Sequence, residues 1–291
     1  MQDSKNKKSL MVRLLVFVLI LVVILSGMSA MLSRKVMLDD SVVPVSEKPL
    51  INVLKEPENS IDLIVLGNSL SFTSIEPKQM EEAYGLNTWH CGQPGQSIQQ
   101  AYHSLEELLE VQTPQVVLVE TNMMFDDIFG VNSWKKSFDT WLRYHFAFFH
   151  FHDLWKSYLL GKTYEQNSYH GYQERTGVKP YEAGFYMTPS EDKASFRNNS
   201  CYYMSEMKKL CDEKGIRFVM YSCPSPVHFN YSYHNALTDW SNDQGIEYVD
   251  LNNLLDDVGI NWQEDTMDGG DHVNQNGARK VTDYMGRYLT K

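Results

Sequence analysis

Two short polar segments, near opposite ends of the chain, carry residues that could do chemistry. Ser69 follows the hydrophobic run 61–66 and comes directly after Gly67 and Asn68, while His272 lies shortly before the last helix-like stretch. A serine exposed by a tight turn after a strand can attack a carbonyl carbon, and a histidine can accept its proton. We therefore predict an acyl-transfer site in which Ser69 is the nucleophile and His272 acts first as general base and then as general acid.

Two aspartates lie close enough to His272 in the sequence to orient its ring. A carboxylate must accept a hydrogen bond from Nδ1 of the histidine to hold the required tautomer. Asp271 is adjacent to His272 and would have to fold back sharply, whereas Gly269 and Gly270 would let the chain return from Asp268. The sequence favours Asp268 and leaves Asp271 open as the alternative.

Short apolar runs that alternate with amphipathic ones are the elements that would position these residues. This alternation is typical of an α/β fold, in which a parallel sheet has helices on both faces. Polar residues that follow different strands would then meet at the carboxyl edge of the sheet. The predicted strands are 61–66, 88–91, 115–120, 216–222 and 246–250.

Polar capping residues and glycines mark the predicted helices between these strands. Ser97 can cap a helix with apolar positions every three to four residues, and Asn274 can cap the last helix of the chain. Helices over 200–214 and 231–244 would each end at a glycine. With these helices on its faces, the sheet would be the middle layer of a three-layer sandwich.

The first 35 residues differ in composition from the rest of the chain. Residues 14–32 are uncharged and rich in Leu, Val and Ile, and a bilayer-spanning helix needs about 17–25 such residues. Basic residues flank this run at positions 5, 7, 8, 13, 34 and 35. Because the basic excess favours a cytoplasmic N-terminus, we predict that 1–35 is a cytoplasmic tail and transmembrane anchor and that the remaining chain is extracellular.

A cleaved signal peptide is the alternative for this segment. The stretch 27–29, Gly-Met-Ser, could form a weak cleavage site. However, the apolar run is longer than the roughly 7–15 residues of a signal peptide, and the chain has no Ala-x-Ala motif there. We therefore favour a single-pass protein of the cell membrane.

Charge and motif content exclude several classes of partner. Residues 1–35 carry a net charge of +5 and the whole chain carries −11, so residues 36–291 carry −16, which is unfavourable for binding nucleic acid. Neither a Gly-x-x-x-x-Gly-Lys nor a Gly-x-Gly-x-x-Gly motif is present, and we expect no cofactor. The cysteines lack a paired spacing and are interpreted as buried small residues: Cys91, Cys201, Cys211 and Cys223.

Two segments depart from the alternation of strands and helices. Residues 36–60 contain three prolines and are interpreted as a linker before the main domain, 61–291. Residues 123–199 are interpreted as an aromatic-rich insertion that forms either a lid or an ordinary subdomain at the sheet edge. A few of its residues have a loose spacing of the kind seen in metal sites, namely His145, His150, His152 and Asp153. They are interpreted as packing or surface residues, so no metal site is predicted.

Four sequence blocks, in this order, resemble the SGNH (GDSL-like) hydrolase superfamily from about residue 60 to the C-terminus. They are Gly67-Asn68-Ser69-Leu70, the segment from Gly92 to Ser97, Glu120-Thr121-Asn122, and the region of Asp268 and His272. The resemblance implies a flavodoxin-like sandwich and a serine hydrolase or acyltransferase. It also implies an oxyanion hole made by the backbone N–H groups of Ser69 and Gly95 and the side-chain amide of Asn122.

The match departs from the family pattern in two blocks. Glu120 stands where the third block has a glycine, and the last block has one residue too many between its aspartate and His272. These departures motivate an alternative function, a catalytically inactive SGNH-fold protein that binds or scaffolds a partner membrane acyltransferase.

An N-terminal anchor followed by such a domain resembles membrane-anchored cell-surface esterases and O-acyltransferases of the teichoic-acid D-alanylation accessory type. The resemblance implies that the substrate is an acyl group on a cell-surface glycan or teichoic-type polymer. It also implies a multi-pass membrane acyltransferase as a partner. Trp134 and Trp141 are suited to stacking on sugar rings and are predicted to bind the substrate. The sequence leaves open whether water or a sugar hydroxyl accepts the acyl group.

Overall fold

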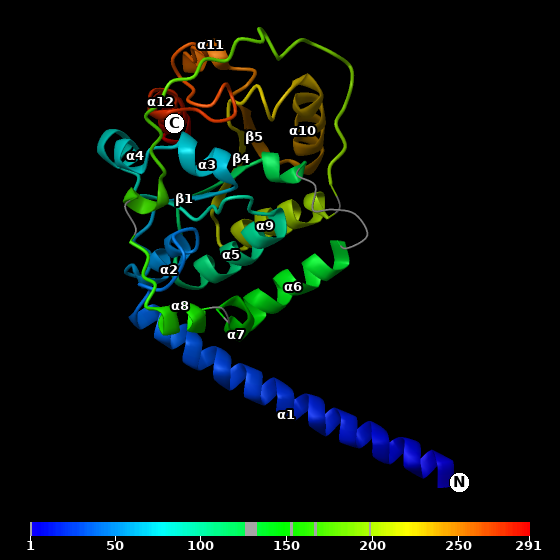
Figure 1. Ribbon diagram of the computed structural model, residues 1–291. Coiled ribbons are helices and arrows are strands. Elements are labelled where there is room, and N and C mark those ends of the chain that lie inside the picture. The colour runs from blue at the N-terminus through cyan, green and yellow to red at the C-terminus, as the bar shows by residue number, and fades with distance from the viewer. Residues whose placement is uncertain (1, 126–132, 152–153, 166–167, 198) are drawn as a thin grey trace. The chain divides into compact units, whose positions relative to one another are not determined.

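The computed structural model describes residues 2–125, 133–151, 154–165, 168–197 and 199–291. The chain divides into two compact units. The first consists of Met1–Pro44 and Trp134–Glu165, and the second consists of Val45–Ser133 and Gln166–Lys291. The second unit contains the sheet (Figure 1). All four predicted catalytic residues also belong to it.

The second unit is built around a five-stranded sheet. Its order is β2-β1-β3-β4-β5, which is the order of flavodoxin-like folds, and every neighbouring pair is parallel. The prediction of an α/β fold with about five parallel strands is therefore confirmed. The strands are β1 (Leu63–Leu66), β2 (Thr88–His90), β3 (Val116–Glu120), β4 (Arg217–Ser222) and β5 (Glu247–Asp250).

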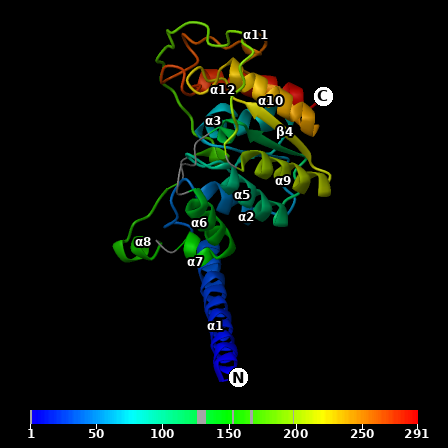
Figure 2. The ribbon, with the colours of Figure 1, turned by 90° about the vertical axis from the view of Figure 1, so that its right-hand side faces the viewer.

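Helices cover both faces of this sheet, as Figures 1 and 2 show. Side chains such as Ile64 and Val117 face a core formed with α2 (Lys48–Lys55), α5 (Ile98–Val111), α9 (Ser200–Glu213) and α10 (Tyr231–Gln244). Side chains such as Leu63 and Leu118 face a core formed with α3 (Ser69–Ser74), α4 (Pro77–Tyr84), α11 (Leu255–Val258) and α12 (Gln275–Leu289). Since both faces are buried, β1 and the first four residues of β3 are continuously apolar rather than alternating.

Local capping residues begin and end several helices where the sequence predicts them. Ser97 forms a capping box with Gln100 at the start of α5, and Asn274 accepts hydrogen bonds from two backbone N–H groups at the start of α12. Gly245 ends α10 with a φ of 63°, in the left-handed region that favours glycine. These signals depend on neighbouring residues alone, so the sequence is sufficient to find them.

The segment 36–60, interpreted as a linker, contains the helix α2. Leu50, Ile51 and Val53 of this helix are buried, and Leu50 and Val53 join the core around α5. An eight-residue helix has only about two turns, too few to give a clear apolar period in the sequence. The second unit accordingly begins at Val45, within the segment interpreted as a linker.

The insertion 123–199 is divided between the two units. Its part from Trp134 to Glu165 belongs to the first unit, whereas 168–197 belongs to the second and is irregular apart from the short helix η3 (Tyr169–Gly171). Backbone hydrogen bonds attach this irregular segment to the loop before His272. Lys179 N donates to Thr266 O at 2.9 Å, and Gly269 N donates to Lys179 O at 3.0 Å.

The described part of the first unit is mostly helical. It contains α1 (Gln2–Leu38), α6 (Ser133–His145) from Trp134 onward, α7 (Ala147–His150) and α8 (Leu154–Leu160). Apolar side chains from Leu10 to Ile24 are exposed on α1. Within the described part of the chain, Lys7–Leu38 is the one helical stretch long and apolar enough to cross a membrane. This is consistent with the predicted span over 14–32, while the orientation of the span stays a prediction.

Gly92 lies where the loop after β2 passes against the loop that carries the predicted nucleophile. A Cβ at this position would lie 2.3 Å from Gly67 O and 2.7 Å from Ser71 Oγ. Because Gly67 O belongs to the backbone, we expect Gly92→Ala to lower the free energy of unfolding by about 1–3 kcal/mol. Urea unfolding measures the change. Gly177→Ala is the control, since its Cβ would make an ordinary 3.5 Å contact, and an equal loss in both variants would contradict the expectation.

Candidate active site

A turn that requires glycine presents Ser69. The turn follows the carboxyl end of β1, and Ser69 is the first residue of α3. Gly67 has a φ of 150°, and a Cβ there would lie 2.7 Å from Glu120 Cβ. Asn68 caps α3 by accepting a hydrogen bond from Leu70 N at 3.1 Å. The serine is therefore held half-buried at the start of a helix and beside the switch point of the sheet, where ligands bind in folds of this order.

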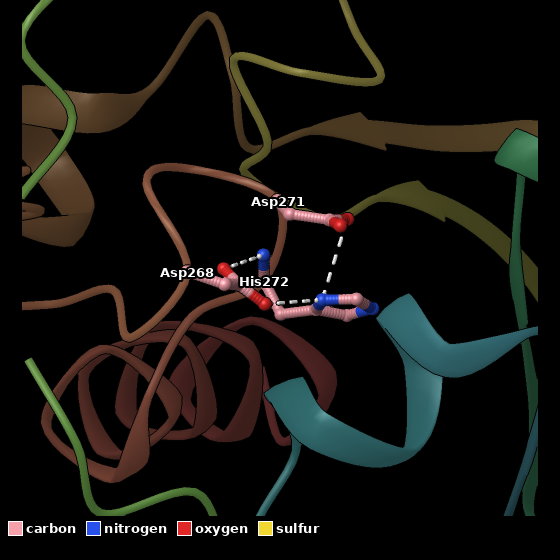
Figure 3. A group of neighbouring side chains, drawn as sticks. All are labelled: Asp268, Asp271 and His272. Atoms are coloured by element: carbon pink, nitrogen blue, oxygen red, sulfur yellow. Dashed lines mark hydrogen bonds and ion pairs between the residues drawn. The ribbon is translucent and has the colours of Figure 1, made fainter. Parts of the chain in front are cut away.

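His272 connects Ser69 to Asp268. Its Nε2 lies 2.7 Å from Ser69 Oγ, and its Nδ1 lies 2.8 Å from Oδ2 of Asp268. The backbone N–H of His272 donates to Oδ1 of the same carboxylate at 2.8 Å, so both aspartate oxygens hold the histidine (Figure 3). The structure thus brings three predicted residues together in the order nucleophile, base and orienting acid, which is the geometry of a serine triad.

Asp271 lies beside the triad and is further from the ring of His272. Its Oδ1 is 3.3 Å from His272 Nδ1, compared with 2.8 Å for Asp268 (Figure 3). Oδ1 of Asp271 also lies 2.7 Å from Nε2 of His228. Since the shorter contact and the second hydrogen bond both come from Asp268, the geometry favours Asp268 as the residue that orients the ring.

Sequence reasoning misses His228, which lies on the loop after β4. Ser225 on the same loop donates through Oγ to Asp271 O at 2.8 Å, so this loop holds Asp271 at both its side chain and its backbone. No motif marks the histidine. The one signal that could have found it is its place after the carboxyl end of a strand, where the functional residues of parallel sheets gather.

Two consecutive glycines let Asp268 fold back onto His272. Gly269 and Gly270 have φ values of 78° and 93°, a backbone conformation that residues with a side chain rarely adopt. Gly270 N donates to Thr266 Oγ1 at 2.9 Å, which closes the loop upon itself. This conformation explains how a block with one residue more than the family pattern still pairs its aspartate with its histidine.

The pairing of Asp268 makes stability depend on pH. Partial burial raises the pKa of Asp268, but hydrogen bonds from the backbone and side chain of His272 outweigh this effect and hold the pKa below its usual value. Such a carboxyl contributes stability above its unfolded pKa of about 3.9, and the contribution is lost as pH falls through the folded pKa. We expect the unfolding free energy of the wild type to fall more steeply below about pH 5 than that of Asp268→Asn. Urea titrations at several pH values measure both slopes, and equal slopes would contradict the expectation.

Asn122 follows β3 and begins the short helix η1 (Asn122–Met124). Asn68 Nδ2 donates to Asn122 Oδ1 at 2.8 Å, which orients the Asn122 amide with Nδ2 as its donor. Glu120 Oε2 accepts a hydrogen bond from Asn122 N at 2.9 Å. The glutamate that departs from the family pattern therefore holds the loop of Asn122. The bond from Asn68 is a second positioning contact that the sequence does not reveal.

Gly92 and Gly95, the two glycines of the second sequence block, have different surroundings. Gly92 is buried against the nucleophile loop, whereas Gly95 is exposed and has a φ of 63° in the turn before Ser97. Glycine is needed at position 92 because the backbone of Gly67 approaches it closely, and at position 95 because the turn into α5 is left-handed there. Donation by Gly95 N–H to an oxyanion stays a prediction.

Replacing Asn122 by alanine tests the oxyanion assignment. We expect Asn122→Ala to lower kcat on a small ester by about 10²–10³-fold, because one preorganised donor to the developing negative charge is lost. Steady-state hydrolysis of p-nitrophenyl acetate measures the change. The matched control is Asn253→Ala, an exposed asparagine on another loop. A loss for Asn122→Ala no greater than that of the control would remove Asn122 from the site.

Among the described residues, Asp268, Asp271 and His272 form the one group of side chains that could hold a metal ion, with ligand atoms within 4.8 Å of one another. The same atoms make the hydrogen bonds of the triad, so their arrangement is explained without an ion. The cysteines are free, and three of them are buried: Cys91, Cys211 and Cys223.

The other predicted residues of the insertion that the structure describes lie in the first unit. Trp134 and Trp141 are on α6, so their role in binding a substrate stays a prediction. His145 is exposed and stacks on Trp141 with ring centroids 4.3 Å apart, which agrees with its interpretation as a packing or surface residue. His152 and Asp153 lie outside the described residues.

Comparisons with known proteins give structural likeness alone. No family model matches the chain, and no curated protein matches it. Among solved structures, an acetyl xylan esterase, AlAXEase, is 15% identical, with a TM-score of 0.41 over 78% of this chain and 99% of that chain. A GDSL-like lipase from Bacteroides thetaiotaomicron VPI-5482 is 9% identical, with a TM-score of 0.41 over 84% of this chain and 96% of that chain. Likeness at this level carries no information on activity, so the chemistry must come from the site itself.

Proposed function

We propose that this protein is a serine esterase or O-acyltransferase of the SGNH type. The observation that carries the proposal is the continuous hydrogen-bonded chain from Ser69 Oγ through His272 to Asp268, with contacts of 2.7 and 2.8 Å. An isolated serine is a weak nucleophile, and an adjacent base that a carboxylate orients is the means by which proteins activate it. The Asn122 amide, which follows the neighbouring strand β3, supplies an oriented donor.

The reaction follows from these positions. Ser69 Oγ attacks the carbonyl carbon of an ester while His272 takes its proton, and the negative charge on the carbonyl oxygen is stabilised by Asn122 and by the backbone N–H groups of Ser69 and Gly95. Collapse of the tetrahedral intermediate breaks the ester bond, and His272 protonates the departing alcohol. Water or a sugar hydroxyl then attacks the acyl-serine while His272 takes its proton. The bond between the acyl carbon and Ser69 Oγ breaks, His272 returns the proton to Ser69 Oγ, and the product is the free acid (hydrolysis) or the new ester (transfer).

A fluorophosphonate probe tests the nucleophile directly. The full chain in detergent should be labelled at Ser69, and Ser69→Ala should remove the label. The control is Ser190→Ala, an exposed serine whose contact with Asn235 is made by its backbone oxygen. Absence of labelling in a folded wild type would favour the alternative function, an inactive SGNH-fold protein that binds or scaffolds a membrane acyltransferase.

The proposed substrate is an acyl group on a cell-surface glycan or teichoic-type polymer. This part of the proposal is supported by the exposed apolar helix α1 and the basic residues before it, which favour a domain held outside the cell membrane. A multi-pass membrane acyltransferase is the proposed partner.

Protease added to intact cells should digest the domain, and full protection of the domain would reverse the proposed topology. Release of acyl groups from isolated cell-wall polymer, compared between wild type and Ser69→Ala, tests the substrate.

A further inference from the structure

Helix α6 exposes a continuous aromatic stripe. Trp134, Phe138 and Trp141 are separated by four and three residues, so they lie on one face of the helix, and they are 65%, 55% and 39% exposed. The rings of Phe138 and Trp141 are stacked, with centroids 6.0 Å apart. Charged residues occupy the opposite side of the helix, where Arg143 Nε donates to Asp139 Oδ2 at 2.7 Å. Exposed aromatic side chains gathered on one face indicate a surface that is covered in use.

A hydrogen bond fixes the neighbouring helix α7 at one height along α1. Phe148 N in α7 donates to Ser29 Oγ at 3.1 Å, and Ser29 is buried there. Figure 1 shows α7 beside the C-terminal part of α1. The apolar run 14–32 ends three residues after Ser29, about 4.5 Å further along the helix axis. If α1 spans a membrane, α7 therefore lies at the depth where hydrocarbon gives way to headgroups.

The composition of this region is suited to that depth. Tryptophan, with an apolar ring and a polar N–H, is enriched at both interfaces of a bilayer. Lys135 Nζ lies 5.7 Å from the centroid of the Trp134 ring, so a basic group adjoins the aromatic stripe. Lysine at an interface can bury its stem and keep its charge among the phosphates. An aromatic face next to basic residues is the pattern of helices that lie in the interface plane.

We propose that α6 and α7 lie in the headgroup interface of the membrane that α1 spans, with the stripe of Trp134, Phe138 and Trp141 in contact with lipid. The aromatic stripe is thus covered by lipid, at the boundary between the headgroups and the acyl chains. This inference depends on α1 as a membrane helix and is independent of the acyl chemistry at Ser69. It assigns the two tryptophans to lipid rather than to sugar rings.

Depth measurements on the full chain test the proposal. The protein is reconstituted into vesicles of phosphatidylcholine and phosphatidylglycerol with a spin label at Phe138→Cys or, as a matched control on the polar side of α6, at Asp139→Cys. The unsubstituted chain gives the background from native cysteines. We expect collisions with a water-soluble nickel complex to be several-fold rarer for the label at 138 than at 139, and collisions with oxygen to be more frequent. Equal accessibility at the two positions would overturn the proposal.

Native tryptophan fluorescence gives a second readout that needs no label. Lipids brominated close to the headgroup should quench the wild type, and the double variant Trp134→Tyr, Trp141→Tyr should lose most of that quenching. Unchanged quenching in the double variant would overturn the proposal, as would failure of the chain to float with vesicles. Quenching or protection of these tryptophans by soluble cell-wall oligosaccharide, without an effect of brominated lipid, would favour sugar binding instead.

Discussion

Ser69→Ala is expected to lower the turnover of small esters by about 10⁵–10⁶-fold, because the acyl-enzyme pathway needs the serine oxygen. The residual rate would come from the oriented donors, which can still stabilise an oxyanion formed by direct attack of water. Loss of the serine leaves His272 and Asp268 in place, so the fold should persist. The rate should therefore fall without a comparable loss of stability.

Single-turnover and steady-state hydrolysis of p-nitrophenyl acetate, with urea unfolding of the same samples, measure this expectation. Ser190→Ala serves as the control for alanine substitution of an exposed serine. A burst of p-nitrophenol in the wild type that is missing in Ser69→Ala would identify the acyl-enzyme. Equal turnover in the two proteins would remove Ser69 from the mechanism.

Asp268→Asn is expected to lower kcat by about 10⁴-fold, and Asp271→Asn by about tenfold or less. An asparagine at 268 can donate through its amide to Nδ1 of His272 and so stabilise the wrong tautomer, which leaves Nε2 protonated and unable to take the proton of Ser69. Asp271 lies 3.3 Å from the same Nδ1 and also contacts His228, so its loss removes a weaker contact.

The two variants form a matched pair, since each converts one carboxylate of the same loop to an amide of equal size. The ratio of their kcat values decides which carboxylate orients the histidine, and the reverse order would assign that role to Asp271. His228→Gln tests whether His228 acts on catalysis through its contact with Asp271. If His228 acts by holding Asp271, His228→Gln and Asp271→Asn should give similar losses, and the double variant should lose no more than either one.

Patterns between near neighbours in the sequence determine the layers of the fold and most of the site. The apolar runs that become β1 and β3, the Gly67-Asn68 turn before Ser69, and the cap at Asn274 each depend on residues a few positions apart. A strand period, a turn glycine or a capping side chain acts through local backbone geometry, so these features can be read without knowing the rest of the chain. The apolar run that becomes α1 is evident for the same reason.

Contacts between residues far apart in the chain decide the remaining features. The bond from Asn68 to Asn122 joins residues 54 positions apart, the bond from His228 to Asp271 joins residues 43 apart, and the bond from Phe148 to Ser29 joins residues 119 apart. None of these pairs has a spacing that a local pattern could reveal. The choice between Asp268 and Asp271 is also made in three dimensions, since either lies near enough in sequence to reach His272. These long-range hydrogen bonds depend on the strand order, on the loop conformation after Gly269 and on the packing of α7 on α1. Each of these three features is set by the burial of apolar surface across a whole unit rather than by any one segment.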